Sequence, residues 1–438
     1  MHCMPQIKKV SVLLGMLLGC LLFFCACGGG KDSGVKIGDR TFDADTTAVS
    51  ITDAAFDDYA ALSQLTQLSV LDLTALPLTP EKYEQISAQV GEDVTILWNV
   101  PLGEKQVPCT ADALHLTESQ LAQAAEALPY FTDLKSVTVE PCALSEDLCR
   151  VAETVRERFP DAQVKAGSQI AGVAVDTETE KVVLNKIKLS DSDIIRLAVR
   201  AFPNIKTYEM CQCGLSDDVM GKLREDFPDI TFIWTVEFDR FSVRTDAVVF
   251  STLEYEIFRN MTEETFRPLF TYCTELRALD IGHHGIKDLS GLANLKKLQV
   301  LILTDNPVSD ISPLAELKDL KYLEINRSEV TDVTPLTKID IEMLSLNENR
   351  HLQNIPELVK CQKLEGLFLF LTNMKKDEAN TLLKGLPDGC YFNYGPSTPD
   401  FHTIFFEKKG IKVREAFRNW KNVESFDYNT KNMYVLKK

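Results

Sequence analysis

The stretch LQVLILTDN, residues 298–306, is followed 22 residues later by LKYLEINRS, residues 320–328, in the same pattern of apolar and polar positions. Apolar residues two positions apart, such as Leu301 and Leu303, place their side chains on one face of a short β-strand. A single copy cannot bury that face, so neighbouring copies must stack against one another. The pattern therefore predicts a ladder of parallel strands, with one strand in each copy.

Five copies of this pattern lie between residues 276 and 372. Their matching positions are, in order, Leu276, Leu279, Ile281 and His284; Leu298, Leu301, Leu303 and Asn306; Leu320, Leu323, Ile325 and Ser328; Leu344, Leu346 and Asn349; and Leu364, Leu367, Leu369 and Thr372. The pattern resembles the leucine-rich-repeat family, in the short 22-residue type found in bacterial internalins. The resemblance implies a curved solenoid with a concave face.

Two other residue types recur in the same copies. Pro313 and Pro335 terminate any helix, which predicts short irregular turns behind the sheet. Asn306 and Asn349 follow the strand sequence, where an amide side chain can bond turn backbone groups that would otherwise be buried without partners. We therefore expect these asparagines to stabilise the turns.

The upstream half of the chain repeats with a longer period. Strand-like sequences are centred on Leu71, Val137, Tyr208 and Leu279, at intervals of 66, 71 and 71 residues. Helix-like stretches follow the first three, at residues 79–90, 145–159 and 216–227, and second helices are expected to begin at Thr117 and Ser190. These modules are predicted to join the short repeats in one curved stack. The predicted fold is therefore an α/β leucine-rich-repeat solenoid, backed by helices in the N-terminal modules and by short turns in the C-terminal repeats.

The N-terminal residues predict export from the cytoplasm. Two lysines precede an apolar stretch at residues 12–26, and a glycine-rich polar sequence follows it. The sequence around Cys27 resembles the lipobox of bacterial lipoproteins, which implies that Cys27 becomes the lipidated first residue. Cys20 fits the residue types of the motif better, but apolar residues 21–24 follow it, where a soluble linker is expected. An uncleaved membrane anchor remains the other alternative, with the same extracytoplasmic topology.

The sequence thus divides into five predicted parts. They are a signal peptide at 1–26, a lipidated cysteine and flexible linker at 27–40, long helix-backed modules at 41–275, short repeats at 276–375 and a C-terminal capping module at 376–438. At 438 residues, with 45% hydrophobic and 25% charged residues, the chain is typical of a folded, water-facing protein. Its net charge of −17 argues against a nucleic-acid partner, because clustered Lys and Arg drive that binding.

No residue set with catalytic or metal-binding spacing stands out. Cys142 and Cys213 occupy the asparagine position of the pattern, and Cys273 and Cys361 occupy apolar positions, so packing in the core is their expected role. A disulfide or a metal site among the cysteines remains an alternative. No known motif joins a nucleophile to a base. We therefore expect no enzyme activity, no cofactor and no metal.

The residues between the buried leucines form the expected concave wall. The candidate binding residues on it are Val300, Ile302, Tyr322, Glu324, Met343, Phe368 and Phe370. Exposed apolar patches often mark partner surfaces, and aromatic residues dominate many interfaces. Asp72, Thr138 and Glu209 fill the matching column of the earlier modules and predict a more acidic N-terminal part. The alternative is that a C-terminal cap or a loop folds over Phe368 and Phe370 and buries them.

These features favour a lipid-anchored protein on the outside of the bacterial cell membrane, facing the exterior or the envelope. Its concave face would bind an unknown protein or a glycan. The host-receptor function of internalins is not implied, because no matching motif is present. Two alternatives remain: an envelope hydrolase or transferase with an active site outside known motifs, and a passive structural scaffold of the envelope.

Overall fold

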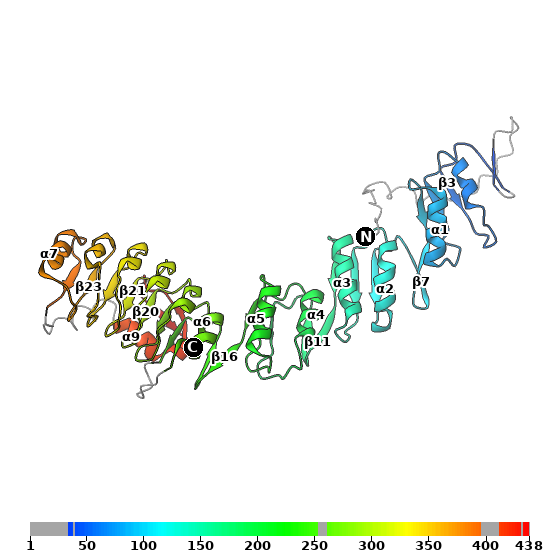
Figure 1. Cartoon of the computed structure of the whole chain (residues 1–438). Helices are drawn as coiled ribbons and strands as arrows, with labels where there is room; N and C mark the ends of the chain where they lie inside the picture. The colour runs from blue at the N-terminus through cyan, green and yellow to red at the C-terminus, as the bar shows by residue number, and fades with distance from the viewer. Residues whose placement is uncertain (1–33, 38–39, 253–260, 396–410, 431, 438) are drawn as a thin grey trace. The chain divides into compact units, whose positions relative to one another are not determined.

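The computed structural model describes residues 34–37, 40–252, 261–395, 411–430 and 432–437 (Figure 1). The predicted signal peptide, Cys20 and Cys27 lie outside the described residues. The chain forms two compact units, Met1–Asp112 with Pro129–Leu134, and Ala113–Leu128 with Lys135–Lys438.

The first unit is built around a small parallel sheet in the order β3-β4-β5. The elements of this sheet and its connections are β3 Ala48–Ser50, η1 Tyr59–Gln64, β4 Val70–Asp72, α1 Pro80–Val90 and β5 Thr95–Leu97. The α1 helix begins where the sequence predicts it, since Pro80 takes its first position and the Thr79 hydroxyl accepts a hydrogen bond from the Lys82 N–H at 3.3 Å. Two antiparallel hairpins complete the unit, β1 Val35–Ile37 with β2 Arg40–Phe42, and β6 Asn99–Leu102 with β7 Lys105–Pro108.

The second unit starts with two modules of the same construction. The first contains β8 Ala113–Leu116, η2 Glu118–Gln120, α2 Leu121–Ala127, β9 Ser136–Val139, α3 Glu146–Arg158, β10 Gln163–Lys165, β11 Gly167–Ile170 and β12 Val173–Asp176. Between α2 and β9 lies η3 Leu128–Tyr130, whose last two residues belong to the first unit. The next contains β13 Lys181–Val183, α4 Asp193–Ala201, β14 Thr207–Glu209, α5 Asp217–Asp226, β15 Thr231–Ile233, β16 Thr235–Phe238 and β17 Phe241–Arg244. The predicted start of a helix at Ser190 is wrong. The α4 helix begins later, and the Ser190 hydroxyl bonds the Asp191 carboxylate at 2.9 Å instead.

Antiparallel hairpins interrupt the predicted continuous ladder. They begin at Asn99, Gly167 and Thr235, which are 68 residues apart each time, and each follows the third parallel strand of its module. A hairpin bonds its backbone groups to its own partner strand, so it does not extend the parallel ladder on from β5, β10 or β15. The parallel strands of the described modules therefore form separate three-stranded sheets and do not continue the hydrogen-bonded ladder of the short repeats.

The short repeats form one parallel sheet of seven strands, β18 to β24 in chain order. These strands are β18 Val249–Ser251, β19 Ala278–Asp280, β20 Val300–Ile302, β21 Tyr322–Glu324, β22 Met343–Ser345, β23 Gly366–Phe368 and β24 Tyr391–Asn393. The connections carry α6 Glu263–Tyr272, η4 Ser290–Asn294, η5 Ser312–Glu316, η6 Thr334–Lys338, η7 Ile355–Lys360 and α7 Lys376–Gly385. Leu279, Leu301 and Leu323 lie in register with no exposed surface. The predicted parallel ladder is confirmed for these repeats.

The asparagine positions stabilise the turns as expected. The Asn306 amide nitrogen donates to the carbonyl oxygens of Ile281 at 2.9 Å and Leu303 at 3.0 Å. Its side-chain oxygen accepts the Ile286 N–H at 3.1 Å. Asn349 makes the corresponding set of bonds two repeats later. Each asparagine thus satisfies three buried backbone groups.

The C-terminal part does not form a single capping module at the end of the stack. The α7 helix and β24 add the last strand of the sheet, whereas four later elements lie elsewhere. These are α9 Ile411–Arg418, η9 Trp420–Asn422, β25 Val423–Phe426 and β26 Tyr434–Leu436. The α9 helix packs on β18 and β19, at the opposite end of the seven-stranded sheet from β24 (Figure 1).

Candidate functional site: the covered concave face

Two columns of side chains run across the seven-stranded sheet on its concave face, opposite the 3-10 helices. In one column Val300 pairs with Tyr322 and Tyr322 with Met343. In the other, Ile302 pairs with Glu324. Because side chains alternate along a strand, these residues lie on the opposite face of the sheet from the buried leucines. The structure therefore brings the candidate binding residues together in the predicted order.

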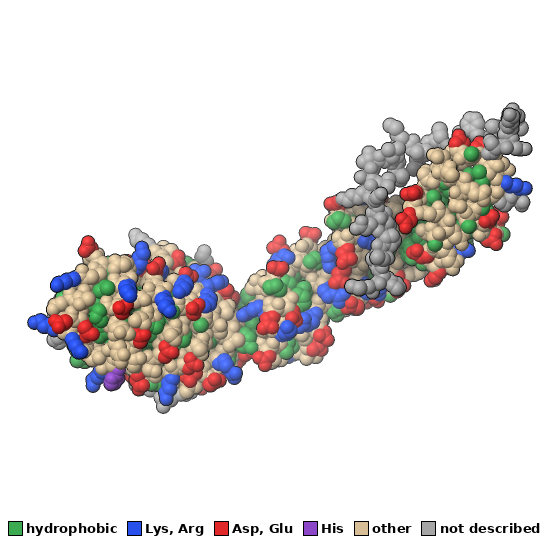
Figure 2. All heavy atoms as spheres, turned by 45° about the horizontal axis from the view of Figure 1, so that its top comes forward, with side chains coloured by type: hydrophobic (Ala, Val, Ile, Leu, Met, Phe, Trp, Pro, Cys, Tyr) green, Lys and Arg blue, Asp and Glu red, His purple; other side chains and the backbone are tan. Residues whose placement is uncertain are grey.

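The same residues are not exposed, and the expectation of an open apolar wall is wrong for most of them. The exposed fractions are 0% for Val300, 9% for Ile302, 2% for Tyr322, 8% for Glu324 and 1% for Phe368, while Met343 and Phe370 are partly buried. Figure 2 shows one face of the molecule, on which apolar side chains are scattered among charged ones. The role of these residues in binding therefore depends on what covers them.

The C-terminal residues 411–437, which we call the covering segment, bury much of this face. Val413, Ala416 and Phe417 of α9 have no exposed surface. The Trp420 ring centre lies 4.9 Å from that of Phe250 on β18. The sequence left open an internal cover over Phe368 and Phe370, whereas the covering segment lies over β18–β21.

Tyr428 extends this cover to the third repeat. Its ring centre is 6.2 Å from that of Tyr322, and the two rings meet edge to face. Its backbone N–H donates to the Gln299 side-chain oxygen at 2.9 Å. The Arg277 guanidinium donates to the Phe426 carbonyl oxygen at 3.1 Å. Sequence reasoning missed Arg277 and Gln299, although both stand one residue before a strand, at equivalent positions of neighbouring repeats.

Two acidic side chains are buried beneath the covering segment. Glu324 accepts a hydrogen bond from the Tyr322 hydroxyl. Burial raises the pKa of Glu324, while the Tyr322 hydroxyl and the positive charge of Arg414 oppose that rise. Asp280 accepts the Ser251 hydroxyl at 3.1 Å and the Gly282 N–H at 3.2 Å. The concave face is thus both apolar and acidic under its cover.

The Asp280 carboxyl makes stability depend on pH. Burial raises its pKa from 3.8 to about 6, and the nearby Glu324 adds to the rise, against the bonds from Gly282 and Ser251 and the His283 charge. The folded state therefore binds this proton more tightly than the unfolded chain, and the stability it contributes is lost as the pH rises from about 4 to about 6. Asp280→Asn removes this loss. The difference in free energy of unfolding between variant and wild type should therefore favour the variant by about 1–3 kcal/mol more at pH 7 than at pH 4.

Chemical unfolding at both pH values, followed by circular dichroism, measures this difference. Asp319→Asn is the matched control, because Asp319 is exposed in the neighbouring repeat. An equal stability change for Asp280→Asn at pH 4 and pH 7 would show that Asp280 does not titrate in this range.

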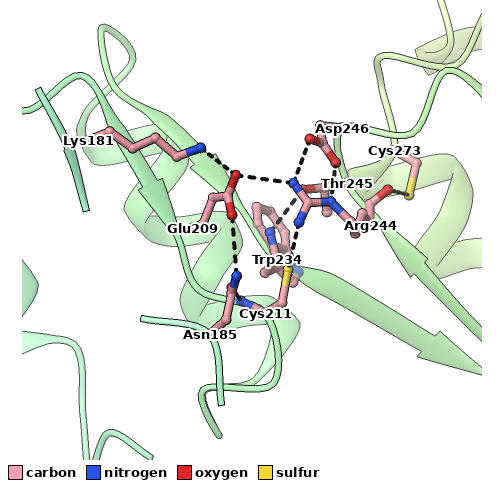
Figure 3. A network of polar contacts seen from close by, with 9 residues as sticks. All are labelled: Lys181, Asn185, Glu209, Cys211, Trp234, Arg244, Thr245, Asp246 and Cys273. Atoms are coloured by element: carbon pink, nitrogen blue, oxygen red, sulfur yellow. Dashed lines mark hydrogen bonds and ion pairs between the residues drawn. The ribbon is translucent and has the colours of Figure 1, made fainter. Parts of the chain in front are cut away.

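A second polar cluster lies in the preceding module (Figure 3). Glu209 on β14 bonds Lys181 at 2.7 Å and Asn185 at 3.3 Å, and Arg244 on β17 lies 3.5 Å away. Arg244 also pairs with Asp246 at 2.8 Å. The Lys181 bond, more than any other contact, lowers the pKa of Glu209. Glu209 therefore has cationic partners and does not form the acidic surface that the sequence suggested.

The cysteines of the described part of the chain are free thiols. Cys109, Cys149, Cys213, Cys273 and Cys361 are buried, in line with the expected role in packing. Burial raises the pKa of Cys149 and of Cys361 to about 11, which disfavours the reactive thiolate. Within the described ranges, no group of three or more His, Cys, Asp or Glu side chains could hold a metal ion. None of the helices described has both the length and the apolar character needed to cross a bilayer.

Comparison with known proteins finds a family match for part of the short repeats. Residues 296–338 match the family described as Leucine Rich repeats (2 copies). No curated protein matches the chain. Among solved structures, internalin C2 of Listeria monocytogenes is 16% identical, with a TM-score of 0.23, and the match covers 56% of this chain and 74% of that one.

Two other solved structures are similar. An internalin (inlF) of Listeria monocytogenes is 17% identical, with a TM-score of 0.26 and coverage of 82% of this chain and 90% of that one. A leucine-rich-repeat protein of Leptospira interrogans is 12% identical, with a TM-score of 0.26 and coverage of 79% and 89%. Together, the family match over residues 296–338 and the register of β18–β24 show that this chain contains leucine-rich repeats and has the fold of a leucine-rich-repeat solenoid.

Proposed function

We propose that this protein is a lipid-anchored binding protein that displays its leucine-rich-repeat solenoid outside the cytoplasm and holds another protein through the concave face. The observation that supports binding is the in-register column of Val300, Tyr322 and Met343, which gathers side chains from successive repeats on one surface. Solenoids use such extended concave surfaces to bind partners. In this chain the surface already holds a polypeptide, the covering segment.

The proposed anchor depends on Cys27. Several acyl chains hold a protein firmly to a membrane, whereas one chain gives marginal binding. With labelled palmitate, we expect the wild type and Cys20→Ser to be labelled and to sediment with membranes. Cys27→Ser should lose the label and leave the membrane fraction. Loss of label in Cys20→Ser alone would move the anchor to Cys20, and labelling of neither wild type nor variants would refute the lipid anchor.

The binding half of the proposal is tested on intact cells. A photo-reactive amino acid at Arg327, an exposed residue in the turn after β21, reports on neighbours of the repeat edge. The control position is Lys296, an exposed residue that follows η4 behind the sheet. We expect a saturable cross-link to one protein from position 327 and none from position 296. Absence of any specific product from position 327 would refute protein binding at this edge and favour a passive scaffold.

A further inference from the structure

The core of the repeats does not depend on the covering segment. Leu279, Leu301 and Leu323 have no exposed surface, and they lie on the opposite side of the strands from the columns that the segment covers. Stacking of neighbouring repeats buries them. The covering segment therefore occupies the concave face much as a ligand occupies a groove.

Two side chains of the concave face bind the main chain of the segment. Arg277 donates to the carbonyl oxygen of Phe426, and Gln299 accepts the N–H of Tyr428. The two recognised groups are two residues apart, one at the end of β25 and one in the turn that follows it. Carbonyl and N–H groups of the main chain are features of a polypeptide, so this pair of contacts recognises a peptide in a way that a glycan would not satisfy.

The side chains of the segment complement those of the concave face. Glu324 is buried, and a buried carboxylate is costly unless a donor or a cation accompanies it. Arg414 on α9 supplies positive charge that favours the ionised Glu324 carboxyl. Tyr428 supplies an aromatic ring against Tyr322. The face thus suits a peptide that brings a cation and aromatic side chains together.

We propose that the concave face of β18–β21 is a reversible docking site for a polypeptide segment that combines an arginine with aromatic residues, and that residues 411–437 are its intramolecular occupant. This inference rests on the proposed binding function and identifies the partner's chemistry as peptide rather than glycan. A partner must displace the covering segment before it binds. The docked segment lowers the apparent affinity for the partner in proportion to the fraction of time that the face is free.

A synthetic peptide with the sequence of residues 411–437 and a fluorophore is the probe. The protein is the full chain, as wild type and as the double variant Arg414→Glu, Tyr428→Ala, which weakens the docked segment and leaves the concave face unchanged. We expect the double variant to bind the peptide at least about tenfold more tightly than the wild type does, as fluorescence anisotropy measures it. Leu436→Ala, at a position 42% exposed, is the control and should bind like the wild type.

A peptide with the same two substitutions should bind neither protein. The proposal is overturned if the double variant has the circular dichroism spectrum of the wild type and binds the natural peptide no more tightly than the wild type does.

If the double variant does not fold, hydrogen exchange of the unmodified chain tests whether the covering segment docks reversibly. We expect amides of α9 and β25 to exchange at least about tenfold faster than those of β19–β21, because the segment opens without unfolding the repeats. Equal exchange in the segment and the strands would overturn reversible docking.

The two proposals fail in different ways. Peptide binding to the double variant, without any cellular cross-link from position 327, would refute the binding of a cellular protein at the repeat edge and leave the docking site intact. A cellular partner without peptide binding would refute the docking site alone.

Discussion

Replacing Tyr322 by alanine is expected to lower the free energy of unfolding by about 3–5 kcal/mol. Only 2% of this side chain is exposed, its ring meets that of Tyr428, and its hydroxyl donates to Glu324. Alanine leaves a cavity between the sheet and the covering segment and removes a donor from a buried carboxylate, and both changes destabilise the fold. The midpoint of chemical unfolding, followed by circular dichroism, measures the loss.

Two variants serve as controls for this prediction. Tyr322→Phe keeps the ring and loses only the hydroxyl, so its loss of stability should be smaller. Tyr394→Ala changes a tyrosine that is 47% exposed and should have little effect. If Tyr322→Ala unfolds at the wild-type midpoint, the face is open in solution and the sequence-based expectation of an exposed aromatic wall is correct after all.

Asn306→Ala is expected to destabilise the repeats by roughly 3 kcal/mol, because it leaves three buried backbone groups without partners. These groups are the carbonyls of Ile281 and Leu303 and the N–H of Ile286. Alanine is too short to reach any of them. The same unfolding measurement, together with hydrogen exchange of the turns on either side of β20, reports the size and the place of the effect.

Asn294→Ala is the matched control, since Asn294 is an exposed asparagine in the preceding repeat. It should unfold within about 0.5 kcal/mol of the wild type. A loss in Asn306→Ala no larger than in Asn294→Ala would show that the turn backbone finds other partners and that the asparagine is not needed.

The repeats and their register could be predicted from the sequence because the 22-residue period is local. Leu301 and Leu323 stand at equivalent positions, and the structure pairs them in adjacent strands. The helix starts at Thr79, Ser145 and Ser216 follow from capping residues, which also act locally. The hairpins after Trp98 and Trp234 were harder to predict, because a strand-like run does not show where a parallel strand ends and an antiparallel one begins.

The sequence predicted which residues lie on the concave face but not that a distant segment buries them. Alternation along the strands places Val300, Ile302 and Glu324 on the concave face, as the sequence indicated. The segment that covers this face bonds Arg277 and Gln299 through Phe426 and Tyr428, which lie more than a hundred residues away along the chain. No periodic pattern links such distant segments. The sequence predicted one capping module at 376–438 and gave no sign that its last residues return to the first strands of the sheet.

The sequence by itself determined the repeating strands, their shared register, the asparagine-stabilised turns and the face on which each side chain lies, because all of these follow from short-range periodicity and backbone hydrogen bonding. Tertiary structure alone decided that hairpins separate the long modules, that Glu209 is paired with Lys181 and Arg244, and that the concave face is closed by residues 411–437. These outcomes depend on which distant surfaces fit each other. Burial of complementary apolar and charged groups selects that fit, and no local pattern in the sequence encodes it.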